Sequence, residues 1–329
     1  NMSEIPKRLV VSVGGNALTL GKGRETIEDQ RAAAKTACEI IAKLWGTNYE
    51  TSMAVTHGNG PQVGFILERF EHALKAGLLH NVPLDAIGAD TQGAIGYMLE
   101  QLIHNEMLKI DPSRAGRIAT LVTQVLVDPN DPAFQDPTKP IGSWMTEDQA
   151  RSQQDKFGWK VKCMNDKRDD GYRRVVSSPV PIEILNIDAI RACINAGFLT
   201  IGGGGGGILV ARRPDGTLYG LEGVIDKDLT TALMAGDIGA KLMAILTAVP
   251  GVIDPEEFKT HGVEGIVIPE LDLSEANDIL PRLQKGSMGP KLAACINFTE
   301  KTGEPSLITD FGHAERAITE GRGGTRIVV

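Results

Sequence analysis

Three short apolar segments that each run directly into glycines constrain this chain more than any other feature of its sequence. They are residues 9–15 (Leu-Val-Val-Ser-Val-Gly-Gly), residues 54–60 (Ala-Val-Thr-His-Gly-Asn-Gly) and residues 199–207, where Leu-Thr-Ile precedes six glycines. A short apolar run bounded by glycine is typical of a buried strand that ends in a tight turn. Backbone N–H groups in such a turn form a concave, weakly positive site for an anion. One such turn would be an ordinary loop, but three predict a single phosphate site built from several strand ends.

The second of these segments also opens a helix. Pro61 follows Gly60 and suits the first helical position, where its missing N–H has no partner to lose. Apolar residues then recur at helical spacing as far as residue 74, which predicts a helix with one buried face. Gly58, Asn59 and Gly60 therefore precede a helix N-terminus, whose free N–H groups attract anions.

Strand and helix patterns alternate along most of the chain. The spacing of apolar residues predicts helices over residues 26–45, 61–74, 92–107, 184–196, 229–235, 274–284 and 290–301. Apolar and β-branched runs predict strands over residues 9–13, 53–56, 118–127, 199–201, 208–211, 242–247, 306–310 and 325–329. This alternation predicts an α/β fold with a mainly parallel sheet covered on both faces.

Residues 128–181 interrupt the alternation. They contain six prolines and a dense mixture of charges between residues 155 and 174. Apolar residues in this span could form a small core of their own: Ile141, Trp144, Met145, Phe157, Trp159, Val161, Tyr172, Val175 and Val176. We therefore predict an inserted subdomain and not a linker. A segment this long inside a compact fold is often a lid.

Composition excludes one class of partner and suggests a compartment. With 34 basic and 42 acidic residues the net charge is −8, so the chain lacks the basic character that nucleic-acid binding requires. No apolar run has membrane-spanning length, and we expect a cytoplasmic protein. Cys38, Cys163, Cys193 and Cys295 form no Cys-x-x-Cys pair, so we expect reduced, mostly buried thiols.

Three lysines stand where a bound anion would explain them. Lys227 and Lys291 are each predicted in the first turn of a helix, where a cation opposes the helix dipole at a cost of about 0.3–1 kcal/mol. A shared anion would offset that cost, and Asp228 is placed to hold Lys227. Lys139 precedes Pro140 in a proline-stiffened loop, which could present its ammonium group with little entropy to lose. Each lysine alone would be an ordinary exposed cation, whereas the set predicts a site.

The sequence lacks the motifs of several other kinds of active site. His57 and the other histidines show no metal-ligand spacing and no nucleophile–histidine–acid signature. The glycine run formally contains Gly-x-Gly-x-x-Gly, but a strand pattern follows it where a dinucleotide site needs a helix. We expect Mg²⁺ to arrive with a nucleotide. Glycine loops, helix N-termini and lysines without a general base are typical of phosphoryl transfer, which depends on positioning and charge neutralisation.

Six motifs, in order and across nearly the whole chain, resemble those of the carbamate kinases within the amino-acid kinase superfamily. They are residues 13–18 (Val-Gly-Gly-Asn-Ala-Leu), 57–64 (His-Gly-Asn-Gly-Pro-Gln-Val-Gly), 137–142 (Pro-Thr-Lys-Pro-Ile-Gly), 171–176 (Gly-Tyr-Arg-Arg-Val-Val), 224–228 (Val-Ile-Asp-Lys-Asp) and 286–291 (Gly-Ser-Met-Gly-Pro-Lys). Many superfamily members carry a lysine just before the first glycine pair. Here Ser12 and Val13 stand in that region, as in the carbamate branch, where the insertion supplies the lysine.

The resemblance implies an open α/β/α sandwich with the insertion, residues 128–181, protruding as a lid. An N-terminal lobe of residues 1–198 would hold carbamate or carbamoyl phosphate, and a C-terminal lobe of residues 199–329 would hold ATP or ADP. The implied reaction is ATP + carbamate ⇌ ADP + carbamoyl phosphate with Mg²⁺. The family usually runs it toward ATP at the end of arginine fermentation, and as a homodimer.

The same resemblance implies residue roles. The transferred phosphoryl group and carbamate would lie against Gly14, Gly15, Asn16, Gly58, Asn59 and Gly60. Lys227 and Lys291 would neutralise phosphates, and Asp228 would orient these lysines. Lys139 would reach into the site from the lid. Nucleotide contacts would come from Lys227, Thr247, Met288, Gly289 and Lys291. The attacking oxygen of carbamate is already anionic, so the absence of a general base is expected and charge compensation becomes the main task.

Alternatives from other classes stay open at this point. An acetylglutamate-type kinase would carry the early lysine and lack Lys139. A nucleotide or metabolite sensor would need binding but not this set of lysines, and a dehydrogenase would need a helix after the glycine run. Two stretches depart from the family pattern and concern the adenine pocket. They are Ile208-Leu209-Val210, where isoleucine-proline is usual, and residues 247–255.

Overall fold

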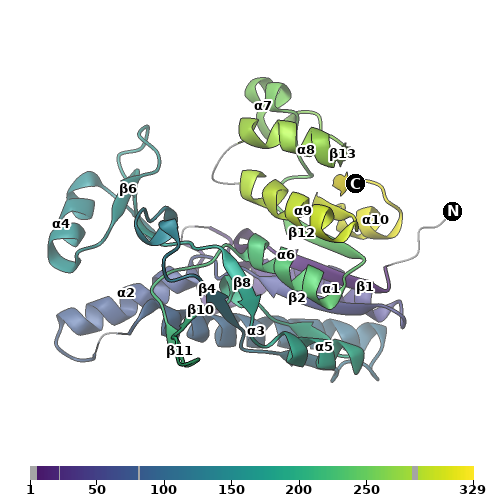
Figure 1. The fold of residues 1–329 in the computed structure, drawn as a ribbon, viewed down its shortest axis with the longest axis horizontal. Helices are drawn as coiled ribbons and strands as arrows, with labels where there is room; N and C mark the ends of the chain where they lie inside the picture. Colours follow the sequence, from purple (N-terminus) through teal and green to yellow (C-terminus); the bar gives the residue numbers. More distant parts are fainter. Residues whose placement is uncertain (1–5, 22, 81, 284–287) are drawn as a thin grey trace.

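A computed structural model describes residues 6–21, 23–80, 82–283 and 288–329. Its centre is an eight-stranded sheet (Figure 1). In spatial order the strands are β13 (Glu270–Asp272), β15 (Thr325–Val328), β14 (Ser306–Asp310), β12 (Leu242–Thr247), β1 (Arg8–Val13), β2 (Ser52–His57), β9 (Leu199–Ile201) and β3 (Ile118–Thr120). Every neighbouring pair is parallel except β14 and β15. The predicted α/β class with a mainly parallel sheet is confirmed.

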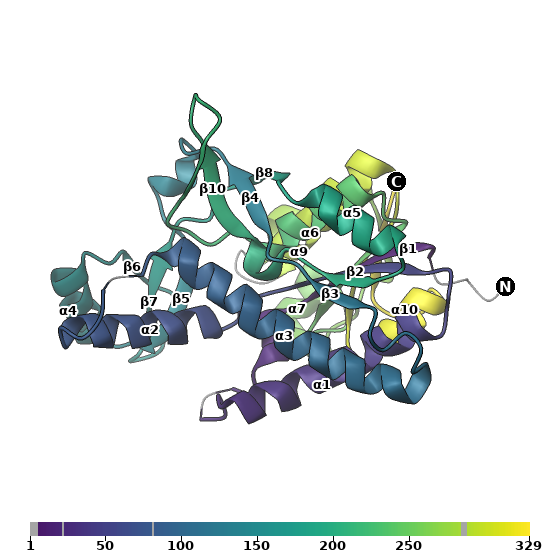
Figure 2. The same cartoon turned by 90° about the horizontal axis from the view of Figure 1, so that it is seen from below.

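Helices cover both faces of this sheet (Figure 2). One face packs on α1 (Ile27–Gly46), α3 (Leu84–Ile110) and α10 (Ala314–Thr319). The other packs on α5 (Ile187–Asn195), α6 (Lys227–Ile238), α8 (Leu273–Ile279) and α9 (Met288–Thr302), and α7 (Pro255–His261) precedes α8 in the chain. Alternate residues of β1 serve the two cores, because successive strand side chains point to opposite faces: Leu9 and Val11 to the first, Val10 to the second.

Three predicted element boundaries were wrong. Residues 118–127 are two strands, because the chain leaves β3 and enters a second sheet as β4 (Gln124–Val127). Between the two strands, Gln92 accepts a hydrogen bond from the Thr123 N–H (2.8 Å). Residues 184–196 begin with the end of a strand, β8 (Pro181–Ile184), before α5. The helix expected over residues 274–284 leaves α-helical geometry after Ile279, and Pro281 lies in the 3-10 turn that follows. Gln284 lies outside the described residues.

The second sheet has the order β11 (Leu218–Gly220), β10 (Ile208–Arg212), β4 and β8. It joins the glycine run to the strands that flank the insertion, because β10 directly follows the glycines and pairs parallel with β4. The predicted boundary at residue 199 falls at the start of β9, which lies between β2 and β3 in the eight-stranded sheet. The division into lobes of residues 1–198 and 199–329 stays a prediction.

The insertion is a subdomain that projects from the sheet beside α2 (Gln62–Lys75) (Figure 1). It contains an antiparallel sheet of β5 (Lys139–Met145), β7 (Tyr172–Val176) and β6 (Val161–Cys163), with α4 (Glu147–Phe157). Its core is partly shared, since Ile141 packs with Val63 and Leu67 of α2. A half-buried ion pair joins Arg174 to Glu71 of α2 (2.8 Å). The insertion is therefore anchored on the helix that begins at the second glycine loop.

Two further sequence expectations can be compared with the structure. Cys38 and Cys295 are buried, Cys193 is half-buried and Cys163 is exposed, so only half of the thiols match the expected burial. Among the described residues, none of the helices combines the length and apolar character that crossing a bilayer requires.

Candidate active site

The first two glycine loops meet at one edge of the sheet. β1 and β2 are parallel and in register, with Val13 opposite His57, so both strands end together. The Gly58 N–H donates to the Val13 carbonyl (3.0 Å). A Cβ atom on Gly15 would lie 2.9 Å from the Gly60 Cα, closer than side chains tolerate. The absence of side chains therefore lets the two loops touch and leaves their N–H groups at a common edge.

The glycine run forms a fixed turn against these loops. Gly202 donates to the Val55 carbonyl (3.0 Å), and all six glycines are buried. Gly203, Gly205 and Gly206 have φ values of 62°, 64° and 90°, which glycine adopts without strain. A Cβ atom on Gly205 would lie 2.9 Å from the Asn59 Nδ2. The predicted constrained turn is confirmed, and the strand that follows it removes the dehydrogenase alternative.

A cleft of about 220 Å³ lies where these loops meet the insertion and the helices α6 and α9. Its walls bring together most of the sequence-predicted residues: Gly15, Gly58, Asn59, Gly60, Lys139, Lys227, Asp228 and Lys291, with Gly205 and Asp226. Gly14 is not among the lining residues, and its N–H donates to the Leu246 carbonyl (3.3 Å). Asn16 lies in a 3-10 turn, Gly15–Leu18, and its side chain is outside the described part of the structure.

Lys227, Asp228 and Lys291 form one charged cluster in the cleft. Both lysines bind the same carboxylate: Lys227 Nζ donates to Asp228 Oδ1, and Lys291 Nζ donates to Asp228 Oδ2 (3.2 Å). The Asp228 side chain is only 4% exposed, and those of Lys227 and Lys291 are 11% and 17% exposed. Lys227 opens α6 and Lys291 lies in the first turn of α9, as predicted. One buried carboxylate thus holds two ammonium groups from two helices.

The electrostatics of this cluster favour a bound anion. Burial would raise the pKa of Asp228, but the Lys227 and Lys291 ammonium groups outweigh it and lower that pKa to about 2. Burial lowers the pKa of the Lys227 ammonium group, and Asp228 opposes this shift. Two cations therefore share one negative charge in a poorly solvated place. An arriving phosphate would supply the missing charge where Coulomb interactions are strong.

Two side chains in contact with these lysines had no role assigned from the sequence. Ser12 is fully buried in β1 and its Oγ accepts from Lys227 Nζ (2.8 Å). Asp226 caps α6 and its Oδ2 accepts from Lys139 Nζ (2.8 Å). Both lie within or beside quoted motifs, but their partners are 215 and 87 residues away along the chain. The available signal for Ser12 was its place in the region where the resembling superfamily often carries a lysine.

His57 does not supply a base to the cleft. It is 1% exposed at the end of β2, and burial lowers its pKa to about 4. Its neutral ring donates from Nδ1 to the Gly58 carbonyl (2.8 Å). Among the described residues no cluster of histidine, cysteine and carboxylate side chains could hold a metal ion. His57 is therefore not available as a general base, and the described residues of the cleft offer charge and hydrogen bonds.

The other residues predicted to contact a nucleotide lie outside the cleft lining. Thr247 ends β12, opposite Asp310 of β14. Met288 and Gly289 lie in the first turn of α9, which also contains Lys291, and Met288 packs on the second core. The preceding Gly286 and Ser287 lie outside the described residues.

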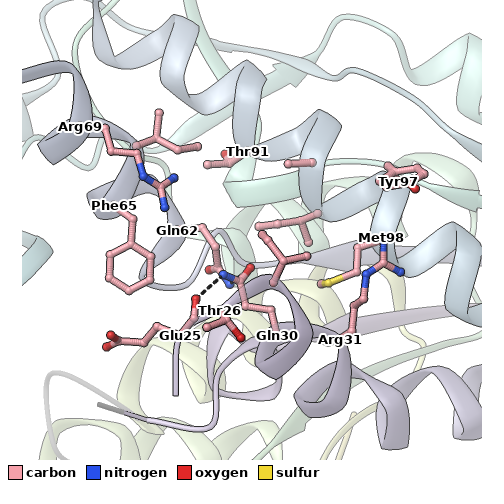
Figure 3. A pocket seen from close by; sticks show the side chains of 14 residues that line it. Glu25, Thr26, Gln30, Arg31, Gln62, Phe65, Arg69, Thr91, Tyr97 and Met98 are labelled. Atoms are coloured by element: carbon pink, nitrogen blue, oxygen red, sulfur yellow. Dashed lines mark hydrogen bonds between the residues drawn. The ribbon is translucent and has the colours of Figure 1, made fainter. Parts of the chain in front are cut away.

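A larger cavity, of about 490 Å³, lies between α1, α2 and α3 (Figure 3). The exposed wall of this cavity is mainly apolar, with Phe65, Ile95 and Met98 among the lining residues, and the lysine cluster does not line it. Gln62 lines this cavity and follows the second glycine loop, and its Nε2 donates to the Leu18 carbonyl (3.0 Å) and to Gln30 Oε1 (3.1 Å). The smaller, charged cleft is therefore the candidate active site, because it holds the groups that can do chemistry.

Similarity to known proteins identifies the family of this chain. Residues 7–310 match the model of the amino acid kinase family. The chain is 38% identical to carbamate kinase from Haemophilus influenzae (97% of this chain and 96% of that protein) and 38% identical to carbamate kinase-like protein YahI from Escherichia coli (97% and 98%). The structure of carbamate kinase from Giardia lamblia bound to AMP-PNP aligns with a TM-score of 0.85 at 35% identity, covering 98% of both chains.

The chain belongs to the amino acid kinase family, among the carbamate kinases. It is therefore a kinase, a phosphotransferase, with the amino acid kinase fold. The resemblance read from six motifs is confirmed over nearly the full length.

Proposed function

We propose that this kinase catalyses ATP + carbamate ⇌ ADP + carbamoyl phosphate in the cleft described above. The observation that carries the proposal is the convergence of Lys139, Lys227 and Lys291 on glycine loops that can bind phosphate. In the direction of ATP synthesis, an oxygen of the ADP β-phosphate attacks the phosphorus of carbamoyl phosphate. The bond from phosphorus to the carbamoyl oxygen breaks, and carbamate leaves with the electron pair. No proton is transferred, so the step needs no general base, and the two carboxylates that line the cleft are paired with lysines.

Each part of the cleft would have a distinct role. The transferred phosphoryl group and carbamate would lie against Gly14, Gly15, Asn16, Gly58, Asn59 and Gly60, and the N–H groups of Gly15 and Gly60 would donate to them. Lys227 and Lys291, held by Asp228, would neutralise charge on the moving phosphoryl group. Thr247, Met288 and Gly289 would contact the nucleotide, and Lys139 would reach the acyl phosphate from the insertion, which acts as a lid.

Mg²⁺ would enter with the nucleotide. Asp226 and Asp228 are the carboxylates that line the cleft, and both are paired with lysines. This donor set fits a metal carried by ATP or ADP phosphates better than one held by the protein. Bound in that way, Mg²⁺ would neutralise phosphate charge.

The biological setting is also part of the proposal. Following the family resemblance, we propose a cytoplasmic enzyme that makes ATP from carbamoyl phosphate in arginine catabolism. We further propose a homodimer. Among the described strands β3 forms a free edge of the eight-stranded sheet, and the neighbouring α3 exposes 59% of Tyr97, features that suit pairing with a second copy.

The test is ATP formation from ADP, Mg²⁺ and an acyl phosphate. Carbamoyl phosphate should support rapid synthesis, and acetyl phosphate and acetylglutamate phosphate should not. ATP formation from another donor alone would mean that the chain is a kinase of a different substrate. Nucleotide binding without ATP formation from any of the three donors would contradict the proposal and favour the sensor.

A further inference from the structure

Asp226 joins two parts of the candidate site that are far apart in sequence. It is the N-cap of α6, and its Oδ1 accepts from the Asp228 N–H (2.9 Å). Its Oδ2 accepts from Nζ of Lys139, the first residue of β5 in the insertion (2.8 Å). One carboxylate therefore connects the projecting subdomain to the helix turn that carries Lys227 and Asp228.

We propose that Asp226 is a positioning residue that holds Lys139 of the insertion in the cleft. The proposal rests on the proposed function, in which Lys139 acts on the acyl phosphate. Because the cap hydrogen bond fixes one oxygen of Asp226, the other presents a defined acceptor to the ammonium group of Lys139. The cap thus sets the position of Lys139 relative to the adjacent residues Lys227 and Asp228.

The surroundings of this ion pair distinguish it from an ordinary surface contact. The side chains of Lys139 and Asp226 are 32% and 21% exposed, and both line the cleft. The pair spans 87 residues, whereas many other ion pairs of the chain join exposed residues three or four apart. Exposed pairs of that kind contribute little, but a pair that orders a lid over a reacting group can set a rate.

Charge balance gives a reason for a second aspartate in the cleft. Asp228 neutralises part of the charge of Lys227 and Lys291, but it accepts no hydrogen bond from Lys139. Without Asp226, like-charge repulsion would drive the Lys139 ammonium group away from the other two before substrate arrives. Asp226 therefore allows a third cation to stand in the cleft of the free enzyme.

Helix capping alone does not require this arrangement. Asp272 also caps a helix, α8, with its Oδ1 accepting from the Glu275 N–H (2.8 Å), and it makes no ion pair with a lysine in the described residues. Asp272→Asn is therefore a matched control for the loss of charge at a capping aspartate. In Asp226→Asn the amide oxygen can still accept from the Asp228 N–H, while the attraction for Lys139 is lost.

The experiment compares full-length Asp226→Asn, Lys139→Met, the double variant and Asp272→Asn. We expect Asp226→Asn to lower kcat/KM for carbamoyl phosphate by about tenfold to a hundredfold, with ADP affinity and melting temperature near wild type. In the Lys139→Met background the same change should cost less than about twofold, because coupled residues are not additive. Asp272→Asn should retain wild-type turnover.

A second readout does not depend on activity. Acylation of Lys139 by an amine reagent, followed by peptide mass spectrometry, should be several-fold faster in Asp226→Asn than in wild type. An unchanged labelling rate would overturn the positioning role. So would a loss of kcat/KM in the double variant equal to the product of the losses in the two single variants. If wild type makes no ATP from carbamoyl phosphate, the proposed function fails while the labelling still decides whether Asp226 holds Lys139.

Discussion

At the scale of single residues, two lysines of the candidate site share one buried carboxylate. Replacing Lys227 or Lys291 with methionine removes one cation and leaves Asp228 with the other. We expect kcat for ATP formation to fall by about 10²- to 10³-fold, since each ammonium group would stabilise charge in a poorly solvated cleft. Circular dichroism and the melting curve should show a folded protein.

Ser12→Ala is the graded comparison for this test. It removes only the hydroxyl that accepts from Lys227 Nζ and leaves the ion pair, so its loss of kcat should be about tenfold or less. Wild-type turnover in Lys227→Met or Lys291→Met would remove that lysine from the mechanism.

Which residues belong to the candidate site could be predicted from the sequence better than which residues contact one another there. Lys139, Lys227, Asp228 and Lys291 follow from helix position, loop stiffness and motif order, and the structure brings all four into one cleft. Ser12 and Asp226 could not be assigned roles, because a serine in a strand and an aspartate at a cap each have an ordinary local explanation. Their second partner comes from tertiary packing alone.

At the scale of elements, α2 links the second glycine loop to the insertion. Gly64 of α2 lies against the backbone of the insertion, where an added Cβ would come 2.4 Å from the Gly142 Cα. Gly64→Ala should therefore displace β5 and Lys139, and we expect it to cost about 1–3 kcal/mol of unfolding free energy. Turnover should fall more than ADP affinity, measured by steady-state kinetics and calorimetry.

Gly236→Ala is the matched control within α6. An added Cβ there meets only Thr302 Cγ2 at 3.7 Å, an ordinary contact. Its helix should gain up to about 1 kcal/mol from the better propensity of alanine, without loss of turnover. If Gly64→Ala behaves like Gly236→Ala, the close approach of α2 and the insertion has no functional weight.

Element types could be predicted from the sequence better than element ends. The helix expected over residues 92–107 is part of α3, Leu84–Ile110, because polar and glycine residues in its first turns hide the apolar stripe. The residues expected as one strand over 118–127 belong to two sheets, with β3 ending at Thr120 and β4 beginning at Gln124, and a run rich in β-branched residues carries no sign of such a change. Which strand pairs with which is set by tertiary packing and not by local pattern.

At the scale of the whole molecule, packing around the glycine loops links stability to acidity through His57. A Cβ atom on Gly204 would lie 2.4 Å from the His57 Nε2, so the ring is enclosed between β2 and the glycine run. Burial lowers its pKa from 6.5 to about 4 in the folded protein. Between these values the unfolded chain binds the proton and the folded chain does not, so stability falls as the pH falls.

We expect this group to remove up to about 3 kcal/mol of unfolding free energy between pH 6.5 and about 4. Asp228 acts in a different window: its lowered pKa contributes stability that is lost only as the pH falls from its unfolded value toward about 2. Urea unfolding of wild type and His57→Asn across the range from neutral pH to about pH 5 separates the two. The variant will be less stable at neutral pH because it leaves a gap, but its stability should decline less steeply with acid. Parallel curves for the two proteins would mean that His57 takes up a proton in the folded state, and that the junction of glycine loops which forms the cleft opens easily to water.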